Sequence, residues 1–160
     1  MVIRGYKTED KEALISAQYR FQGYLTEIDD LKLLRCNPGY GEVYTEDMLK
    51  KIKERGGKVF VAEDNENIIG FVAGVMDEQS ELDKLGHKTM KYGDVLDLFV
   101  EEEFRGTGIG KELMAQMENY FRSQNCKAVM IGVFGPNEKA HKFYEQLGYT
   151  DRDYRVQRML

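Results

Sequence analysis

The sequence is poor in the residues that build metal centres, redox sites and disulfides. Its 160 residues include two cysteines, Cys36 and Cys126, which are far apart and have no metal-ligand or redox spacing. We interpret them as free thiols. The two histidines, His87 and His141, fall in a long loop and on a helix, and we interpret both as structural or surface residues. No metal site is therefore expected.

Long apolar runs are also missing. No run approaches the roughly 20 residues that span a bilayer, and residues 1–6 lack the apolar core of a signal peptide. The formal net charge of −5 argues against general nucleic-acid binding, which depends on a basic face. We therefore expect a cytoplasmic protein that has neither a membrane nor a nucleic acid as its partner.

What is present is an α/β pattern that we interpret as one domain, residues 1–160. Strands are expected at residues 1–6, 58–63, 68–76, 95–100 and 128–133, with a last strand from Tyr149 onward. Helices are expected from Thr8 to about Gly23, from Thr45 to Gly56, from Ile109 to Phe121 and from Asn137 to Gly148. Residues 77–93 form either a plain surface loop or a loop with a helical turn near Leu82 and Leu85. Because a hairpin precedes a strand–helix–strand unit, the sheet should be mixed.

A glycine-rich loop follows the strand at 95–100. Its residues are Arg105, Gly106, Thr107, Gly108, Ile109 and Gly110. A dinucleotide fingerprint would need a third glycine at Lys111, and a P-loop would need serine or threonine at Glu112, so neither motif fits. The loop does fit Arg/Gln-x-x-Gly-x-Gly/Ala, a pattern for the pyrophosphate of coenzyme A. Taken alone, it is equally compatible with an ordinary glycine-rich turn.

A second motif follows the strand at 128–133. Residues 137–149 read Asn-x-x-Ala-x-x-Phe-Tyr-x-x-x-Gly-Tyr. Together with the glycine loop, this motif resembles the GNAT superfamily of N-acetyltransferases. The resemblance is strong over residues 95–149 and coarse over the first 57. It implies an α/β (α+β) fold with a mixed, mostly antiparallel sheet of six to seven strands and about four flanking helices. A V-shaped splay would separate the strands at 95–100 and 128–133.

The resemblance also implies acetyl-CoA as cosubstrate, bound by the part of the domain from residue 58 to 160. The pantetheine arm would lie along the backbone of Leu98, Phe99 and Val100. The pyrophosphate would be held by Arg105, Gly106, Thr107, Gly108, Ile109, Gly110 and Lys111. Asn137 would bond the pantetheine or a nearby backbone group, and Tyr144 would point at the thioester sulfur. Without the motif, Tyr144 reads as a core residue, because it lies on the apolar face of its helix.

The chemistry of thioester aminolysis assigns roles to these residues. An alkyl amine is mostly protonated at neutral pH, so a carboxylate has to accept its proton. A backbone N–H of Phe99 or Val100 would bind the oxyanion, and the Tyr144 hydroxyl would protonate the departing thiolate.

The carboxylate base is the open question. Some family members have a glutamate where this chain has Leu96. The nearest carboxylates are Asp94 and Asp97, which a regular strand turns to opposite faces, so that only one faces the site unless a bulge intervenes. Either one could instead hold a loop or bind the substrate ammonium.

We therefore expect acetyl transfer from acetyl-CoA to a primary amine by direct attack in a ternary complex. The missing glutamate leaves a second interpretation open, a non-catalytic acyl-CoA-binding or regulatory module. We expect the acceptor to be a small-molecule or peptide amine, with residues 1–57 as the acceptor-side region. Residues 22–44, the loop 77–93 and the C-terminal strand would select it. Six residues predict either a cation-friendly wall or a solvated face: Tyr24, Glu27, Asp29, Asp30, Tyr40 and Tyr44. A homodimer is compatible with the resemblance.

Overall fold

A five-stranded sheet is the centre of the computed structural model, which describes residues 1–159. The strands are β1 (Val2–Gly5), β2 (Lys58–Asp64), β3 (Asn67–Asp77), β4 (Tyr92–Val100) and β5 (Ala128–Ile131), and they lie in this order. The first four are antiparallel to their neighbours, and β5 is parallel to β4. The sheet is therefore mixed and mostly antiparallel, as the sequence predicted.

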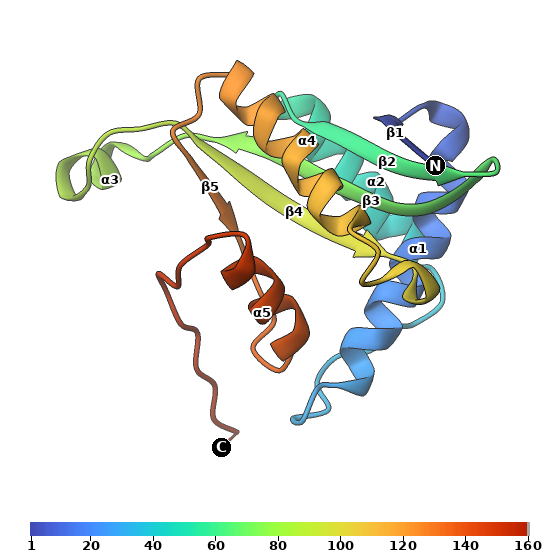
Figure 1. Cartoon of the computed structure of the whole chain (residues 1–160). Coiled ribbons are helices and arrows are strands. Elements are labelled where there is room, and N and C mark those ends of the chain that lie inside the picture. The colour runs from blue at the N-terminus through green and yellow to red at the C-terminus, as the bar shows by residue number, and fades with distance from the viewer. Residues whose placement is uncertain (160) are drawn as a thin grey trace.

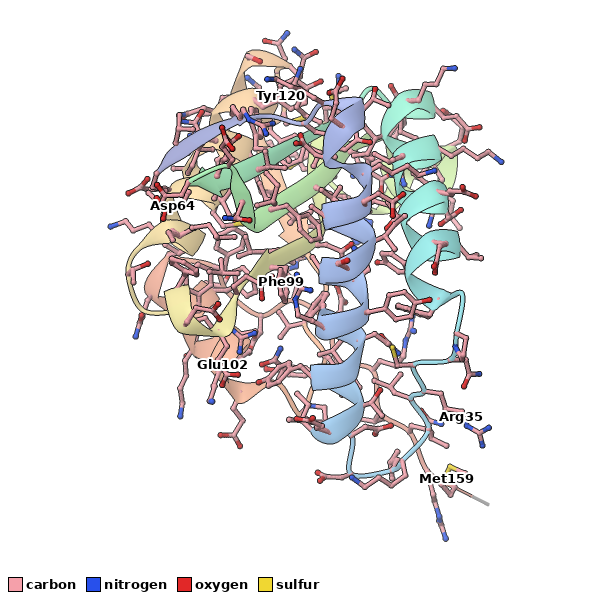
Figure 2. The ribbon with its side chains drawn as sticks, turned by 90° about the vertical axis from the view of Figure 1, so that its right-hand side faces the viewer. Arg35, Asp64, Phe99, Glu102, Tyr120 and Met159 are labelled. Carbon is pink, nitrogen blue, oxygen red and sulfur yellow. The ribbon has the colours of Figure 1, made fainter. Side chains whose placement is uncertain are left out.

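Helices cover both faces of this sheet (Figure 1). The helices are α1 (Lys11–Glu27), α2 (Tyr40–Glu54), α3 (Glu81–Gly86), α4 (Ile109–Ser123) and α5 (Glu138–Gln146), with short 3-10 turns at Thr8–Asp10 and Glu102–Phe104. Figure 2 shows α1 and α2 side by side on one face, with Phe99 of β4 beside α1. Helices α4 and α5 pack against the other face. No helix within residues 1–159 is long and apolar enough to cross a membrane.

The sheet divides the core into two clusters, because alternate residues of each strand point to opposite faces. On the α1/α2 face, Leu14 and Met48 pack against Phe71 and Phe99. On the α4/α5 face, α4 packs on β2, β3 and β4 through apolar residues that recur every four positions. These residues are Ile109, Leu113, Met117 and Phe121. Tyr144 of α5 belongs to this second cluster.

The predicted splay lies between β4 and β5. The two strands pair only where residues 92–95 meet residues 128–131. Beyond this point β4 continues to Val100 and pairs with β3 alone. The segment that follows β5 turns away from β4 through Gly132 and Gly135-Pro136. Figure 1 shows the two strands diverging toward α5. One side of the last half of β4 is thus left without a strand partner.

Strand β4 also contains a bulge. Asp97 pairs with Ala73 and Val95 pairs with Gly74, so Leu96 is an extra residue between two consecutive partners on β3. Leu96 and Asp97 both face α1 and α2: Leu96 packs on the cluster there, and Asp97 is hydrogen-bonded to Gln18 and Tyr44. The bulge therefore breaks the alternation that we expected from a regular strand.

Several sequence predictions need correction. The sheet of the described residues has five strands rather than six or seven, and the expected strand from Tyr149 onward is absent. Gly148, with φ 88°, ends α5, and the side chains from residue 150 to 159 are exposed, so the alternation there buries no apolar face. Strand β5 also ends at Ile131 rather than at residue 133.

Helix boundaries differ as well. Helix α1 runs past Gly23 to Glu27. Helix α2 begins at Tyr40 rather than Thr45, because Gly39 adopts φ 88° and turns the chain into the helix. Gly41 lies in the first turn of α2, where a Cβ would come within 2.6 Å of the Tyr19 ring on α1. Residues 81–86 form the short helix α3, which agrees with the second of the two interpretations of that loop.

Candidate active site

The glycine loop joins β4 to α4 at the open end of the splay. Gly106 (φ 78°) and Gly108 (φ 97°) both adopt left-handed conformations, and Gly108 is the N-cap of α4. Within residues 1–159 the backbone N–H groups of residues 106–111 have no acceptor. Alternating conformations of this kind form an anion-binding nest, and the dipole of α4 adds positive charge there. The loop thus fits a pyrophosphate group.

Arg105 holds the loop against the end of β4. Its Nε donates to the carbonyl oxygen of Val100 at 3.0 Å. Its guanidinium lies over the ring of Tyr24 on α1, 5.3 Å from the centroid, a cation–π distance. The Tyr24 hydroxyl in turn donates to Oδ1 of Asn137 at 3.3 Å. Tyr24, which we had assigned to the acceptor wall, therefore contacts two of the predicted cofactor residues.

Asn137 begins α5. Its Oδ1 accepts from the backbone N–H of Ala140 at 3.2 Å, so it is the N-cap that the sequence predicted. The side chain is buried. With Oδ1 engaged by Ala140 and Tyr24, the amide Nδ2 is the group that remains to donate a hydrogen bond.

Tyr144 has the core position that the apolar face of its helix predicts. Its ring is buried and packs edge-on against Phe143 and Tyr149, with centroids 5.1 and 5.7 Å away. Its hydroxyl has no hydrogen-bond partner in the described chain, and the residue lines a broad groove of about 2170 Å³ along β5 and α5. Burial raises the pKa of this hydroxyl, and the negative charge of Asp97 raises it further. Tyr144 is thus protonated at neutral pH and able to donate.

Asp97 is a carboxylate enclosed by two polar side chains. It is 5% exposed. Its Oδ2 accepts from Nε2 of Gln18 at 3.0 Å, and its Oδ1 accepts from the Tyr44 hydroxyl at 3.1 Å. Burial raises the pKa of Asp97 to about 6, and the two hydrogen bonds oppose this shift. A carboxylate with this pKa is charged at neutral pH and still basic enough to exchange a proton.

Asp94 lies on the same face as Asp97, because the bulge intervenes between them. Lys51 of α2 lowers the pKa of both carboxyl groups, although burial raises each more strongly. For Asp94 the charge of Asp77 adds to the upward shift. No hydrogen bond within residues 1–159 joins Asp94 to the other predicted site residues. The structure therefore centres Asp97 in the site and leaves Asp94 at its margin.

The residues that we expected along the pantetheine arm differ in the direction of their backbone N–H and C=O groups. The N–H of Glu101 donates to Ile69 on β3, so by alternation Phe99 also turns its backbone groups to β3. Leu98 and Val100 turn theirs to the splay. Of the two candidate oxyanion donors, Val100 therefore has the free N–H, while the Phe99 side chain packs on the α1/α2 face.

A model of the acetyltransferase (GNAT) family matches residues 25–149 of this sequence. This chain belongs to the GNAT family. The match includes the glycine loop, the bulged strand and the Asn137 helix, and it begins just after Gln18 and Tyr24.

Two curated archaeal relatives share part of this GNAT sequence. An uncharacterised N-acetyltransferase of Methanocaldococcus jannaschii is 34% identical over 94 residues, which are 58% of this chain and 53% of the relative. An uncharacterised N-acetyltransferase of Archaeoglobus fulgidus is 36% identical over 86 residues, 54% of this chain and 55% of the relative. The chain spans about half the length of the curated relatives it matches.

Solved structures share the fold over nearly the whole chain. A mutant of the BH1408 protein from Bacillus halodurans has a TM-score of 0.85 at 20% identity, covering 100% of this chain and 99% of that one. An aminoglycoside antibiotic 6'-N-acetyltransferase from Acinetobacter haemolyticus has a TM-score of 0.75 at 14% identity, covering 100% and 98%. An acetyltransferase from Clostridium acetobutylicum, solved with acetyl-CoA, has a TM-score of 0.73 at 18% identity, covering 99% and 95%. At these identities the likeness shows the fold alone.

The candidate site contains one side chain that we did not predict, Gln18, and two tyrosines, Tyr24 and Tyr44, whose contacts with Asn137 and Asp97 we did not predict. The sequence does mark Gln18, because it is a polar residue on the apolar face of α1. In the structure it is 1% exposed. Nothing in the sequence links Tyr44 to Asp97 or Tyr24 to Asn137. Glu101 belongs to the acidic turn before the loop and forms an ion pair with Arg20 on α1.

Proposed function

We propose that this GNAT chain transfers the acetyl group of acetyl-CoA to a primary amine by direct attack within a ternary complex. The observation that carries the proposal is the row of backbone N–H groups at residues 106–111, which have no acceptor within residues 1–159 and lie at the open end of the splay. Burial raises the pKa of Tyr144, and the charge of Asp97 raises it further. The proposal therefore pairs a nest that fits a pyrophosphate with a protonated phenol and a carboxylate on the elements that border the splay.

Acetyl-CoA supplies a thioester, whose carbonyl carbon is the electrophile. The free N–H groups of residues 106–111 bind the pyrophosphate, and the backbone of Leu98 and Val100 holds the pantetheine arm as an added strand would. Asn137 donates from Nδ2 to the same arm. These contacts hold the reacting carbon beside Asp97 and Tyr144. Attack by the bound amine is then effectively unimolecular.

The proton movements follow from the two side chains. Asp97 takes a proton from the acceptor ammonium and leaves a neutral amine. As the new N–C bond forms and the C–S bond breaks, the N–H of Val100 stabilises the negative charge on oxygen. The Tyr144 hydroxyl gives its proton to the departing thiolate. The acylated nitrogen loses its second proton to solvent, and Tyr144 and Asp97 return to their starting protonation states by exchange with solvent. The products are an N-acetyl amine and coenzyme A.

Thiol release from acetyl-CoA in the presence of a panel of amines tests this proposal. Tyr144→Phe should lower kcat by about 100-fold while leaving the affinity for acetyl-CoA within about threefold, because only the hydroxyl is lost. Tyr120→Phe is the matched control: the Tyr120 hydroxyl donates to Gly56 at the far end of the sheet. Unchanged kcat in Tyr144→Phe would remove this hydroxyl from the mechanism.

A non-catalytic acyl-CoA-binding module is the second candidate. It is favoured by one observation: both oxygens of Asp97 already accept hydrogen bonds from within the protein. Isothermal titration with acetyl-CoA, combined with the thiol assay, separates the two functions. Binding without turnover on any amine supports the module, and turnover supports the enzyme.

A further inference from the structure

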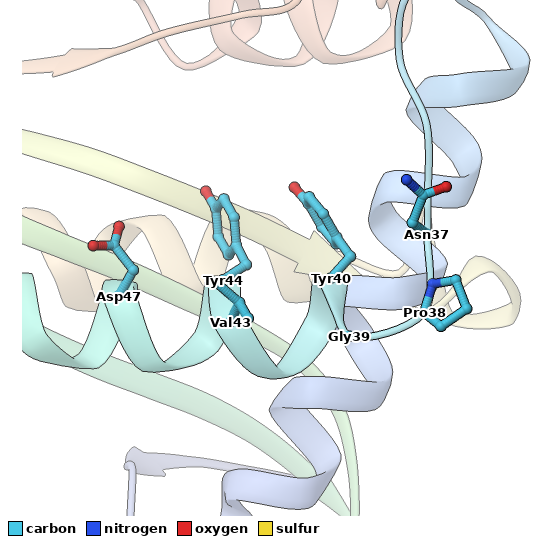
Figure 3. A pocket seen from close by; sticks show the side chains of 7 residues that line it. All are labelled: Asn37, Pro38, Gly39, Tyr40, Val43, Tyr44 and Asp47. Atoms are coloured by element: carbon cyan, nitrogen blue, oxygen red, sulfur yellow. The ribbon is translucent and has the colours of Figure 1, made fainter.

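A cavity of about 470 Å³ lies at the N-terminal end of α2, beside the residues that surround Asp97. It is lined by the turn at residues 37–39 and by Tyr40, Val43, Tyr44 and Asp47 (Figure 3). Its walls are therefore two tyrosine rings, a valine and a proline, with one carboxylate among them. The residues belong to the part of the chain, 1–57, that we assigned to the acceptor.

Three of these side chains occupy one side of α2. Tyr40, Tyr44 and Asp47 are spaced by four and three residues, which places them in a row along the helix. Figure 3 shows the two hydroxyl groups and the Asp47 carboxylate on the same side. The two rings are stacked, with centroids 5.5 Å apart and planes inclined by 26°. The row thus presents a flat aromatic surface that ends at a carboxylate.

A second carboxylate lies at the buried side of this row. Tyr44 donates its hydroxyl hydrogen to Asp97 at 3.1 Å, and both Asp97 and Asp47 raise the pKa of Tyr44. The Tyr44 ring is therefore flanked by a buried negative charge and by a second one at the rim. Asp47 is engaged by Lys51 at 2.7 Å, but both side chains are about half exposed, and exposed pairs of this kind are weak.

We propose that this cavity binds the acceptor and that it selects aliphatic diamines. One nitrogen lies at Asp97, where it loses its proton and is acetylated as described above. The second stays protonated and pairs with Asp47 in place of Lys51. The methylene chain between them lies along the Tyr44 ring, which Tyr40 supports by stacking, and its buried surface and the cation–π contact both contribute. This assignment rests on the proposed acetyl transfer and adds the class of its substrate.

The test compares 1,5-diaminopentane with pentylamine, which has the same chain length and only one charge. The parent enzyme should show a kcat/KM at least about tenfold higher for the diamine, a ratio typical of one charge-assisted contact. Asp47→Asn should lower the value for the diamine by about tenfold and that for pentylamine by less than twofold. Raising the salt concentration should shrink the diamine preference in the parent enzyme.

Glu54→Gln is the matched control. Glu54 is an exposed carboxylate on the same helix that pairs with Lys50 at 3.9 Å, four residues away, and it does not line the cavity. This variant should change neither kcat/KM. Equal values for the two amines in the parent, or equal losses in Asp47→Asn, would overturn the diamine assignment and leave acetyl transfer standing. Absence of turnover with every amine tested would overturn both.

Discussion

At the scale of single residues, Asp97 is the group on which the proposed chemistry depends. It is a carboxyl group in an apolar layer, held by one hydrogen bond from α1 and one from α2. Desolvation disfavours its charged form more than these two donors favour it, so its pKa is raised to about 6. The same shift that makes Asp97 a usable base also makes its charge unfavourable for folding.

The first prediction concerns the pH dependence of the reaction. Asp97 accepts a proton only when it is charged, so kcat/KM should rise with pH along a limb centred near pH 6. Asp97→Asn should lose this limb, and its kcat/KM at pH 8 should fall by about 100-fold or more. The measurement is a pH–rate profile of both proteins under a constant ionic strength. The same limb in the Asn variant would assign it to another group.

The second prediction concerns stability. The pKa of Asp97 is higher in the folded protein, about 6, than its ordinary value of 3.8. The carboxyl group therefore contributes most favourably to folding below about pH 4, and that contribution is lost as the pH rises through 6. Asparagine does not ionise. Asp97→Asn should thus raise the free energy of unfolding at pH 8 by about 1–3 kcal/mol relative to the parent.

Urea unfolding of both proteins at pH 8 and pH 4 measures this difference. The gain should diminish toward pH 4, where Asp97 is protonated in the folded parent. An Asn variant that is less stable than the parent at both pH values would contradict the prediction, because it would mean that the two hydrogen bonds outweigh desolvation.

At the scale of elements, the glycine loop is the part of the site that the sequence predicts best. Its hydrogen bonds are local: the Thr107 hydroxyl donates to the carbonyl oxygen of Phe104, and Arg105 donates to that of Val100. Left-handed conformations at Gly106 and Gly108 are dictated within the loop itself. The strands and the stripe of α4 were predictable for a similar reason, since their periodicity is short.

The third prediction uses this loop. Gly108→Ala places a side chain on a residue with φ 97°, which should cost about 1 kcal/mol of stability. It should also weaken acetyl-CoA binding by about tenfold, since alanine disfavours the left-handed conformation that directs the N–H groups of the nest. Gly148→Ala is the control: Gly148 has φ 88° and equally open surroundings, but it ends α5. It should lose similar stability and keep its affinity in isothermal titration. Equal affinity losses in both variants would contradict the role of the loop.

The contacts between elements were not predictable from local patterns. Gln18 and Asp97 are 79 positions apart, and Tyr24 and Asn137 are 113 apart. No periodicity connects residues at such separations, and only the packing of α1 across the end of the sheet brings them together. The strand expected from Tyr149 onward is absent for the opposite reason, because a local pattern there has no long-range contact to support it. Residues 150–159 alternate as a strand does, but no apolar surface receives them.

At the scale of the whole molecule, the sheet separates two halves with different tasks. The α4/α5 face carries the nest, Asn137 and Tyr144, while the α1/α2 face carries Asp97 and the tyrosine cavity. Over most of its width the sheet keeps these two sides apart. At the splay β4 has no strand neighbour on one side, between the face that carries Asp97 and the face that carries Tyr144. The proposed reaction joins an amine to an acyl donor and would draw one reactant from each side.

The bulge at Leu96 has a consequence for changes in chain length. Because Ala73 and Gly74 are consecutive and pair with Asp97 and Val95, deletion of Leu96 would leave every other pair of β4 and β3 in place. Each remaining side chain would keep its face, Asp94 and Asp97 included. Strand β4 should thus tolerate a one-residue deletion at a position beside the site, where a deletion in most strands would exchange their buried and exposed faces.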